Sequence, residues 1–148
     1  MEQDLIQIQS QSLDLAALVS FVSNPRAGGI ATFLGTTRED KNPSGHPLLA
    51  LDYEAYQAMA ISQMHQIAAD AREHWPICKL AIIHRTGRVA VGEPSVAIVV
   101  STPHRHQAFE ACRFLIDQLK SNVTIWKKEI WANGTTSWAN QLPTHPPQ

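Results

Sequence analysis

The feature that most constrains the fold is an apolar run in the second half of the chain, Ser95 to Ser101, which reads SVAIVVS. A run that is apolar almost throughout predicts a buried strand, because a strand with one face in water alternates apolar and polar residues. Helical spacing of apolar residues follows from about Arg105 to Lys120. The chain therefore needs a layered core of helices and strands around this segment.

The rest of the chain shows shorter patterns of both kinds. Alternation predicts strands at residues 6–8, 30–34, 49–53, 80–84, 89–91 and 123–131 and near Trp138. Asn133-Gly134 predicts the hairpin turn before the last strand. Helical spacing predicts one helix that Ser12 caps and Asn24-Pro25 ends, and another over residues 64–75 that Pro76 ends. Hairpins beside crossover helices favour an α+β architecture with mixed, mainly antiparallel sheets and two or three helices.

The 148 residues are enough for one ordinary domain, which we expect over residues 1–140, with a disordered Pro-rich tail at 141–148. The N-terminus lacks a basic start followed by an apolar stretch, and no apolar run approaches the ~20 residues of a membrane span. We therefore expect a cytoplasmic protein. Cys78 and Cys112 show no paired metal spacing, so we expect reduced, buried thiols.

The charges are unevenly distributed along the chain. Residues 1–78 contain four Lys or Arg against nine Asp or Glu, whereas residues 79–128 contain eight against three. This asymmetry suggests that the second half receives anions, although a solvated basic face fits it as well. The basic density is too low for a nucleic-acid-binding domain.

A His-Arg pair stands where the buried strand gives way to the helix. His104 and Arg105 would lie at a helix N-terminus, where free N–H groups and the positive end of the helix dipole favour anions. A pair that only caps the helix is the alternative. His104 and His106 also form an HxH pair, but no further ligands follow at metal spacing, so we expect no metal and no cofactor.

Three other cations stand out by position. Lys120 falls on the edge of the apolar arc of the predicted helix, and Phe109 falls within that arc. The helix dipole alone also explains a cation at a helix C-terminus. Lys127 has the strand parity of Val123 and Ile125, so its charge would be partly buried. Arg38 opens a polar loop, a common location for a substrate clamp. These residues alone predict an anionic ligand and name no reaction.

Five ordered segments resemble a known family. They are GGIATFLGTTRxxxNxxG (28–45), LDYEAYxxMA (51–60), HRTGxVxVGE (84–93), His104-Arg105, and LKxxxxIWKKE (119–129). Together they look like the large, catalytic subunit of molybdopterin synthase. The resemblance covers about residues 28–138 and implies an α/β-hammerhead fold. It also implies a homodimer that forms a heterotetramer with two small ubiquitin-like sulfur carriers.

The same resemblance implies a reaction and roles for particular residues. The Gly-Gly thiocarboxylate of the carrier would supply sulfur that converts cyclic pyranopterin monophosphate to molybdopterin. Lys120 and Lys127 correspond to the catalytic lysines of the family. Arg38, His104 and Arg105 correspond to its anion and substrate contacts, and Phe33 to a pocket residue. Two rival hypotheses are a relative that binds the carrier without turnover and an unrelated phosphate-binding module. No membrane or nucleic acid partner is expected.

Overall fold

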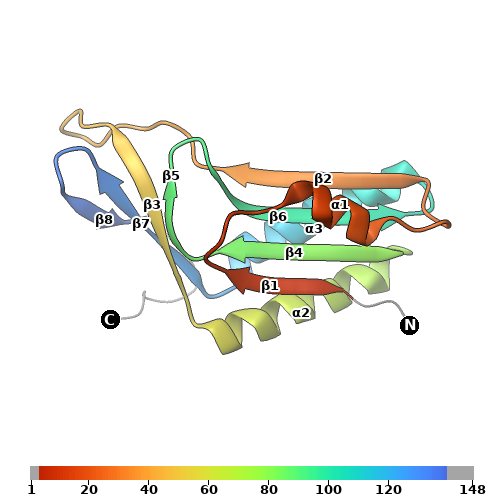
Figure 1. Cartoon of the computed structure of the whole chain (residues 1–148). Coiled ribbons are helices and arrows are strands. Elements are labelled where there is room, and N and C mark those ends of the chain that lie inside the picture. The colour runs from red at the N-terminus through yellow and green to blue at the C-terminus, as the bar shows by residue number, and fades with distance from the viewer. Residues whose placement is uncertain (1–3, 140–148) are drawn as a thin grey trace.

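The computed structural model describes residues 4–139 and arranges them in two sheets and three helices (Figure 1). The described strands are β1 (Leu5–Gln9), β2 (Gly29–Thr36), β3 (Leu48–Ala55), β4 (Lys79–Arg85), β5 (Gly87–Ala90), β6 (Pro94–Thr102), β7 (Ile125–Trp131) and β8 (Thr136–Trp138). The described helices are α1 (Leu15–Val22), α2 (Gln57–His74) and α3 (Arg105–Asn122). The predicted α+β class is confirmed. The tail predicted at 141–148 lies outside the described residues.

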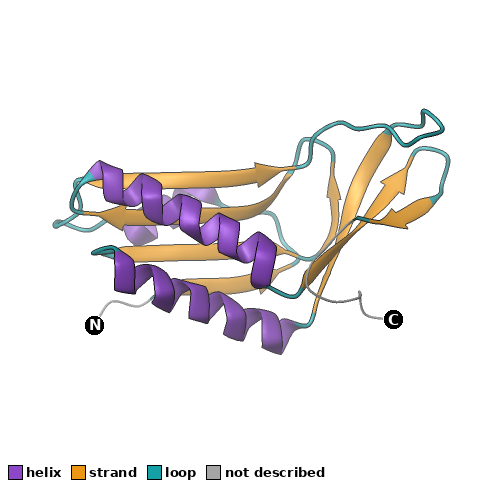
Figure 2. Cartoon of the chain, turned by 180° about the vertical axis from the view of Figure 1, so that it is seen from behind, coloured by secondary structure: helices purple, strands orange, loops and turns teal. Residues whose placement is uncertain are grey.

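The apolar run forms β6, an inner strand of a sheet with the order β1-β4-β6-β2. β1 pairs with β4 in parallel and the other pairs are antiparallel. Residues 95–102 are all buried because helices cover both faces of the sheet. α2 and α3 pack on one face, around Ile82, Ile98 and Leu115 (Figure 2). α1 packs on the other, over Ala81 and Val99.

A second, smaller sheet projects from one end of this layered unit (Figure 1). Its order is β5-β3-β7-β8 and all its pairs are antiparallel. Leu48, Leu51 and Trp131 form its own small apolar cluster. The chain passes from this sheet into α2 through β3, and returns to it from α3 through β7. The C-terminal end of α3 therefore leads directly to the junction of the two sheets.

Three local predictions were wrong. Asp14, not Ser12, caps α1, since its carboxylate accepts a hydrogen bond of 3.1 Å from the Ala17 N–H. Val123 is the C-cap of α3 rather than part of the strand, which begins at Ile125. Phe109 is 66% exposed although the helical pattern placed it in the buried arc. At about 100° per residue, Phe109 lies beside Lys120 on the rim of that arc.

Two glycines allow the start of β2 to lie against the start of α3. A Cβ on Gly28 would stand 2.5 Å from the Pro103 carbonyl oxygen, and one on Gly29 would stand 2.8 Å from the Arg105 Cα. Real Cβ atoms do not approach so closely, so side chains here would push the two elements apart. The Gly28 N–H also donates to the Thr102 carbonyl oxygen at 3.0 Å.

The structure also bears on two expectations from composition, one about the cysteine thiols and one about membrane spans. Cys78 and Cys112 are free and buried, as predicted. The Cys112 thiol donates a long hydrogen bond of 3.8 Å to the Ile98 carbonyl oxygen. Within residues 4–139, no helix is both long enough and apolar enough to cross a membrane.

Candidate active site

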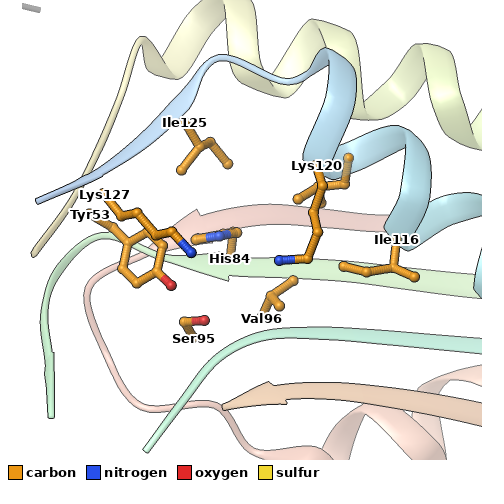
Figure 3. Close-up of a pocket in the computed structure, with 9 residues that line it drawn as sticks. Tyr53, His84, Ser95, Val96, Ile116, Lys120, Ile125 and Lys127 are labelled. Atoms are coloured by element: carbon orange, nitrogen blue, oxygen red, sulfur yellow. The ribbon is translucent and has the colours of Figure 1, made fainter. Parts of the chain in front are cut away.

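A cavity of about 410 Å³ lies at the junction of the two sheets. Its lining comes from β2, β3, β6, β7, the end of α3, and the residues that follow β2 and β8. The polar and charged side chains in this lining are Thr36, Thr37, Arg38, Asp40, Tyr53, Ser95, Lys120, Lys127 and Glu129. A smaller recess of about 50 Å³ shares Tyr53, Ser95 and both lysines with this cavity and adds His84 (Figure 3).

Lys120 reaches the cavity from the last turn of α3. Leu119 before it is 5% exposed and anchors the helix end in the core, while Lys120 itself is exposed. Its side chain extends across the recess toward the side from which Lys127 enters (Figure 3). The C-terminal end of a helix carries partial negative charge, which favours a cation at this position. The edge position predicted from the helical pattern is confirmed.

Lys127 reaches the same recess from β7. It pairs directly with Tyr53 of β3 in the strand register, and the two side chains lie on the same face of the sheet. Lys127 is half-buried, as its strand parity predicted, and Ile125 shares the recess with it. Burial lowers the pKa of Lys127, and the nearby charges of Lys120 and Arg38 lower it further, against a raising effect from Glu129. The Lys127 ammonium group is therefore easier to deprotonate in this site than in water.

Arg38 joins the lining two residues after β2 ends. The backbone of Thr37 fixes its position, since the Thr37 N–H donates to the Glu93 carbonyl at 3.1 Å and the Thr37 carbonyl accepts from the Gly92 N–H at 2.7 Å. This tie holds the start of the 38–47 loop against the turn before β6. Arg38, Lys120 and Lys127 therefore come together from three separate parts of the chain.

The sequence patterns did not identify three polar residues of the recess as site residues. His84, Tyr53 and Ser95 lie on the inner faces of β4, β3 and β6. Burial raises the pKa of Tyr53, and a hydrogen bond with Ser95 opposes that rise. A signal for His84 was available, because it shares the strand parity of the buried Leu80 and Ile82 and so had to face the interior.

His104 and Arg105 lie at the opposite end of α3 and do not line this cavity. The His104 backbone N–H donates to the Gln107 side chain at 3.1 Å, so this pair begins the helix, as predicted. Phe33 is partly buried and packs against the main core. Its ring lies close to Gly35, which is part of the lining. Within one chain, three of the six predicted site residues thus line one cavity, and Phe33 lies beside Gly35 of its wall.

The His104 and His106 rings stack with their centroids 6.2 Å apart. In the part of the chain that the structure describes, no three His, Cys, Asp or Glu side chains gather as a metal site would require. The groups that line the junction are cations, hydroxyls, the carboxylates of Asp40 and Glu129, and one imidazole.

Comparison with known proteins defines the family. A family model described as "MoaE protein" matches residues 8–122. The molybdopterin synthase catalytic subunit of Arabidopsis thaliana is 47% identical over 135 residues, which cover 90% of this chain and 67% of that protein. The chain belongs to this family of molybdopterin synthase catalytic subunits, so it is an enzyme subunit, as its five sequence segments predicted.

Solved structures support the same fold. Molybdopterin synthase from Staphylococcus aureus superposes with a TM-score of 0.84 at 33% identity, covering 90% of this chain and 96% of that one. A complex of subunits 1 and 2 of the molybdopterin-converting factor from Helicobacter pylori 26695 gives a TM-score of 0.75 at 23% identity, covering 90% of this chain and 89% of that one. The second similarity concerns the fold alone.

Proposed function

We propose that this chain transfers sulfur to a pterin, converting cyclic pyranopterin monophosphate to molybdopterin. The sulfur would come from the C-terminal Gly-Gly thiocarboxylate of a small ubiquitin-like carrier subunit. One observation carries the proposal: Arg38, Lys120 and Lys127 line a single cavity of about 410 Å³. A cavity of that size is typical of small-molecule sites.

The charge of the site suits two anions at once. The pterin precursor carries a phosphate and the carrier tail carries a thiocarboxylate, so the two reactants repel each other. Cations fixed around one cavity lower that repulsion and stabilise negative charge that develops during the reaction. The sulfur nucleophile would arrive on the carrier, which is why the chain needs no nucleophile of its own.

Each cation has a proposed role. Lys120 and Lys127 would contact the reacting groups, and the lowered pKa of Lys127 suits a residue that exchanges a proton. Arg38 would bind phosphate, because a guanidinium donates two parallel hydrogen bonds to phosphate oxygens. The Helicobacter pylori structure is a complex of two subunits, which fits the proposal that this chain has a partner subunit. We propose a homodimer that binds two carriers as a heterotetramer.

The function is tested by mixing the chain with thiocarboxylated carrier and the cyclic pterin and measuring dithiolene product. Product is expected with this carrier and not with a control carrier that ends in an ordinary carboxylate. Carrier binding without product would indicate the non-catalytic relative. Binding of the pterin no tighter than inorganic phosphate, again without product, would indicate a general phosphate-binding module.

The position of His104 and Arg105 predicts that the active site is shared between two protomers. Arg105 and Lys120 are fifteen residues apart on α3, hence ~22 Å at 1.5 Å per residue. A small pterin cannot span that distance. If both residues act on one substrate, one of them comes from the partner protomer.

Mixing Arg105→Ala and Lys120→Ala chains should then restore activity. In a symmetric dimer, each mixed dimer has one intact site, so random exchange should recover about a quarter of the wild-type sites. The matched control mixes Lys120→Ala with Lys127→Ala, which line the same cavity in one chain, and should recover nothing. Equal recovery in both mixtures, or none in either after verified exchange, would contradict a shared site.

A further inference from the structure

His84 is a buried imidazole at the edge of the lysine-lined recess, and nothing in the proposed reaction uses it. It lies on β4 and is 4% exposed. Its ring packs edge-on against Tyr53, with the centroids 4.9 Å apart. Tyr53 in turn pairs with Lys127 in the strand register. His84 and Lys127 are therefore both neighbours of Tyr53. Figure 3 shows His84 between the two lysine side chains.

The hydrogen bond at Nδ1 fixes which nitrogen of His84 carries the proton. Nδ1 lies 2.7 Å from the Arg85 carbonyl oxygen. A carbonyl oxygen can only accept, so Nδ1 must be the donor. In the neutral ring, Nε2 then carries a lone pair and can only accept a hydrogen bond. No described residue donates to Nε2 in this structure.

The recess contains few donors that are free to serve this acceptor. The Tyr53 hydroxyl points toward Ser95 and away from the His84 ring (Figure 3), and its hydrogen bond with Ser95 opposes the rise in its pKa. Among the described residues, neither Lys120 nor Lys127 has a hydrogen bond or an ion pair that would hold its ammonium group in place. Lys127 is the half-buried member of the pair and has lost more of its water, so it gains more from a protein acceptor.

We propose that His84 is a positioning residue: its Nε2 accepts a hydrogen bond from the Lys127 ammonium group when the lysine side chain turns toward it, and this bond aims the ammonium group into the cavity. This role requires a ring that stays neutral. Burial lowers the pKa of His84 to about 4, and the charges of Lys120 and Lys127 contribute to that, against a raising effect from the bond to Arg85. The imidazole is therefore an acceptor throughout the neutral range and does not itself exchange protons with substrate.

An acceptor for an ammonium group stabilises its charged form and raises its pKa. His84 would therefore oppose the lowering effects that act on Lys127, which are burial, Lys120 and Arg38, and would add to the raising effect of Glu129. Without His84, the pKa of Lys127 should fall further. A hydrogen bond to a charged group corresponds to a shift of about one pH unit.

The test is an NMR titration of the Lys127 side chain in the whole chain without substrate. His84→Phe keeps a ring against Tyr53 but removes both nitrogens, and should lower the Lys127 midpoint by about one pH unit. The apolar phenylalanine ring can by itself lower the Lys127 midpoint, so His84→Gln is measured beside His84→Phe. Glutamine supplies an amide oxygen near the place of Nε2 and should restore most of the shift. Ile82→Val, on the same face of β4, is the control for core disturbance and should leave the midpoint unchanged.

Two further measurements test the role of His84 independently of the Lys127 titration. In the wild-type chain, nitrogen shifts should show the His84 proton on Nδ1 and an unprotonated Nε2, and a proton on Nε2 would overturn the inference even if no variant folds. One limb of the pH profile of kcat/KM should report the titration of Lys127, and His84→Phe should move this limb to lower pH. If His84 had only a structural role, the substitution would lower kcat/KM without moving the limb. An unchanged Lys127 midpoint in folded His84→Phe also overturns it. The inference rests on the proposed function only for its effect on turnover, since the titration needs no substrate.

Discussion

Replacing Lys120 with alanine is expected to abolish product formation, with turnover lower by at least about a hundredfold. The ammonium group extends into the recess beside Lys127 and would be one of the few charges that meets the reacting anions (Figure 3). The fold should survive, because Lys120 is exposed on the last turn of α3 and exposed charge changes cost within ~0.5 kcal/mol. Single-turnover product formation, thermal melting and carrier affinity are measured together.

Arg113→Ala is the matched control for this variant. Arg113 is also a cation on α3, but its side chain is 86% exposed and bridges to Asp117 away from the cavity. Its removal should leave turnover near wild type. Full activity of Lys120→Ala would remove Lys120 from the reaction. A large fall in its melting temperature would mean that the residue supports the fold instead.

Replacing Lys127 with arginine separates charge from proton chemistry. Arginine keeps the positive charge but has a pKa above ~12 and does not give up its proton. Burial and the neighbouring cations lower the pKa of Lys127, which favours a role in proton exchange. We expect the variant to bind the pterin within about tenfold (~1.4 kcal/mol) of wild type and to turn over at least about a hundredfold more slowly.

Lys128→Arg is the matched control on the same strand. The Lys128 ammonium lies 5.0 Å from the centre of the Trp138 ring and is not part of the cavity lining. An arginine there keeps the cation beside the ring, so turnover should stay near wild type. Near-normal turnover of Lys127→Arg would reduce Lys127 to an electrostatic anchor. Pterin binding weakened by more than tenfold would point to a packing clash.

The fold was largely predictable because its main signals are local. The apolar run at 95–101 predicted a buried strand, and β6 is that strand, covered on both faces. The helix after it was predicted within two residues of its end at Asn122. The errors came from contacts that periodicity does not encode. The cap at Asp14 depends on where the helix begins, and the exposure of Phe109 depends on how far the neighbouring layer extends.

The site was predictable only in part, for a similar reason. Lys127 stood out because its strand parity would partly bury its charge, Lys120 lay at the edge of an apolar arc, and the structure brings both to one cavity with Arg38. Strand parity placed His84 in the interior but not in a site, since its neighbours Tyr53 and Lys127 come from distant parts of the chain. The placement of His104 and Arg105 at the far end of α3 follows from helix length alone.

The stoichiometry of sulfur transfer tests the central claim most directly. Thiocarboxylated carrier and cyclic pterin are mixed with the chain, and mass spectrometry follows the carrier tail and the pterin in the same samples. Conversion to a dithiolene requires two sulfur atoms, so the account predicts that two thiocarboxylates become carboxylates for each molybdopterin formed, and that Lys120→Ala stops both changes. Loss of thiocarboxylate without sulfur on the pterin, or dithiolene formed equally well without the chain, would contradict it.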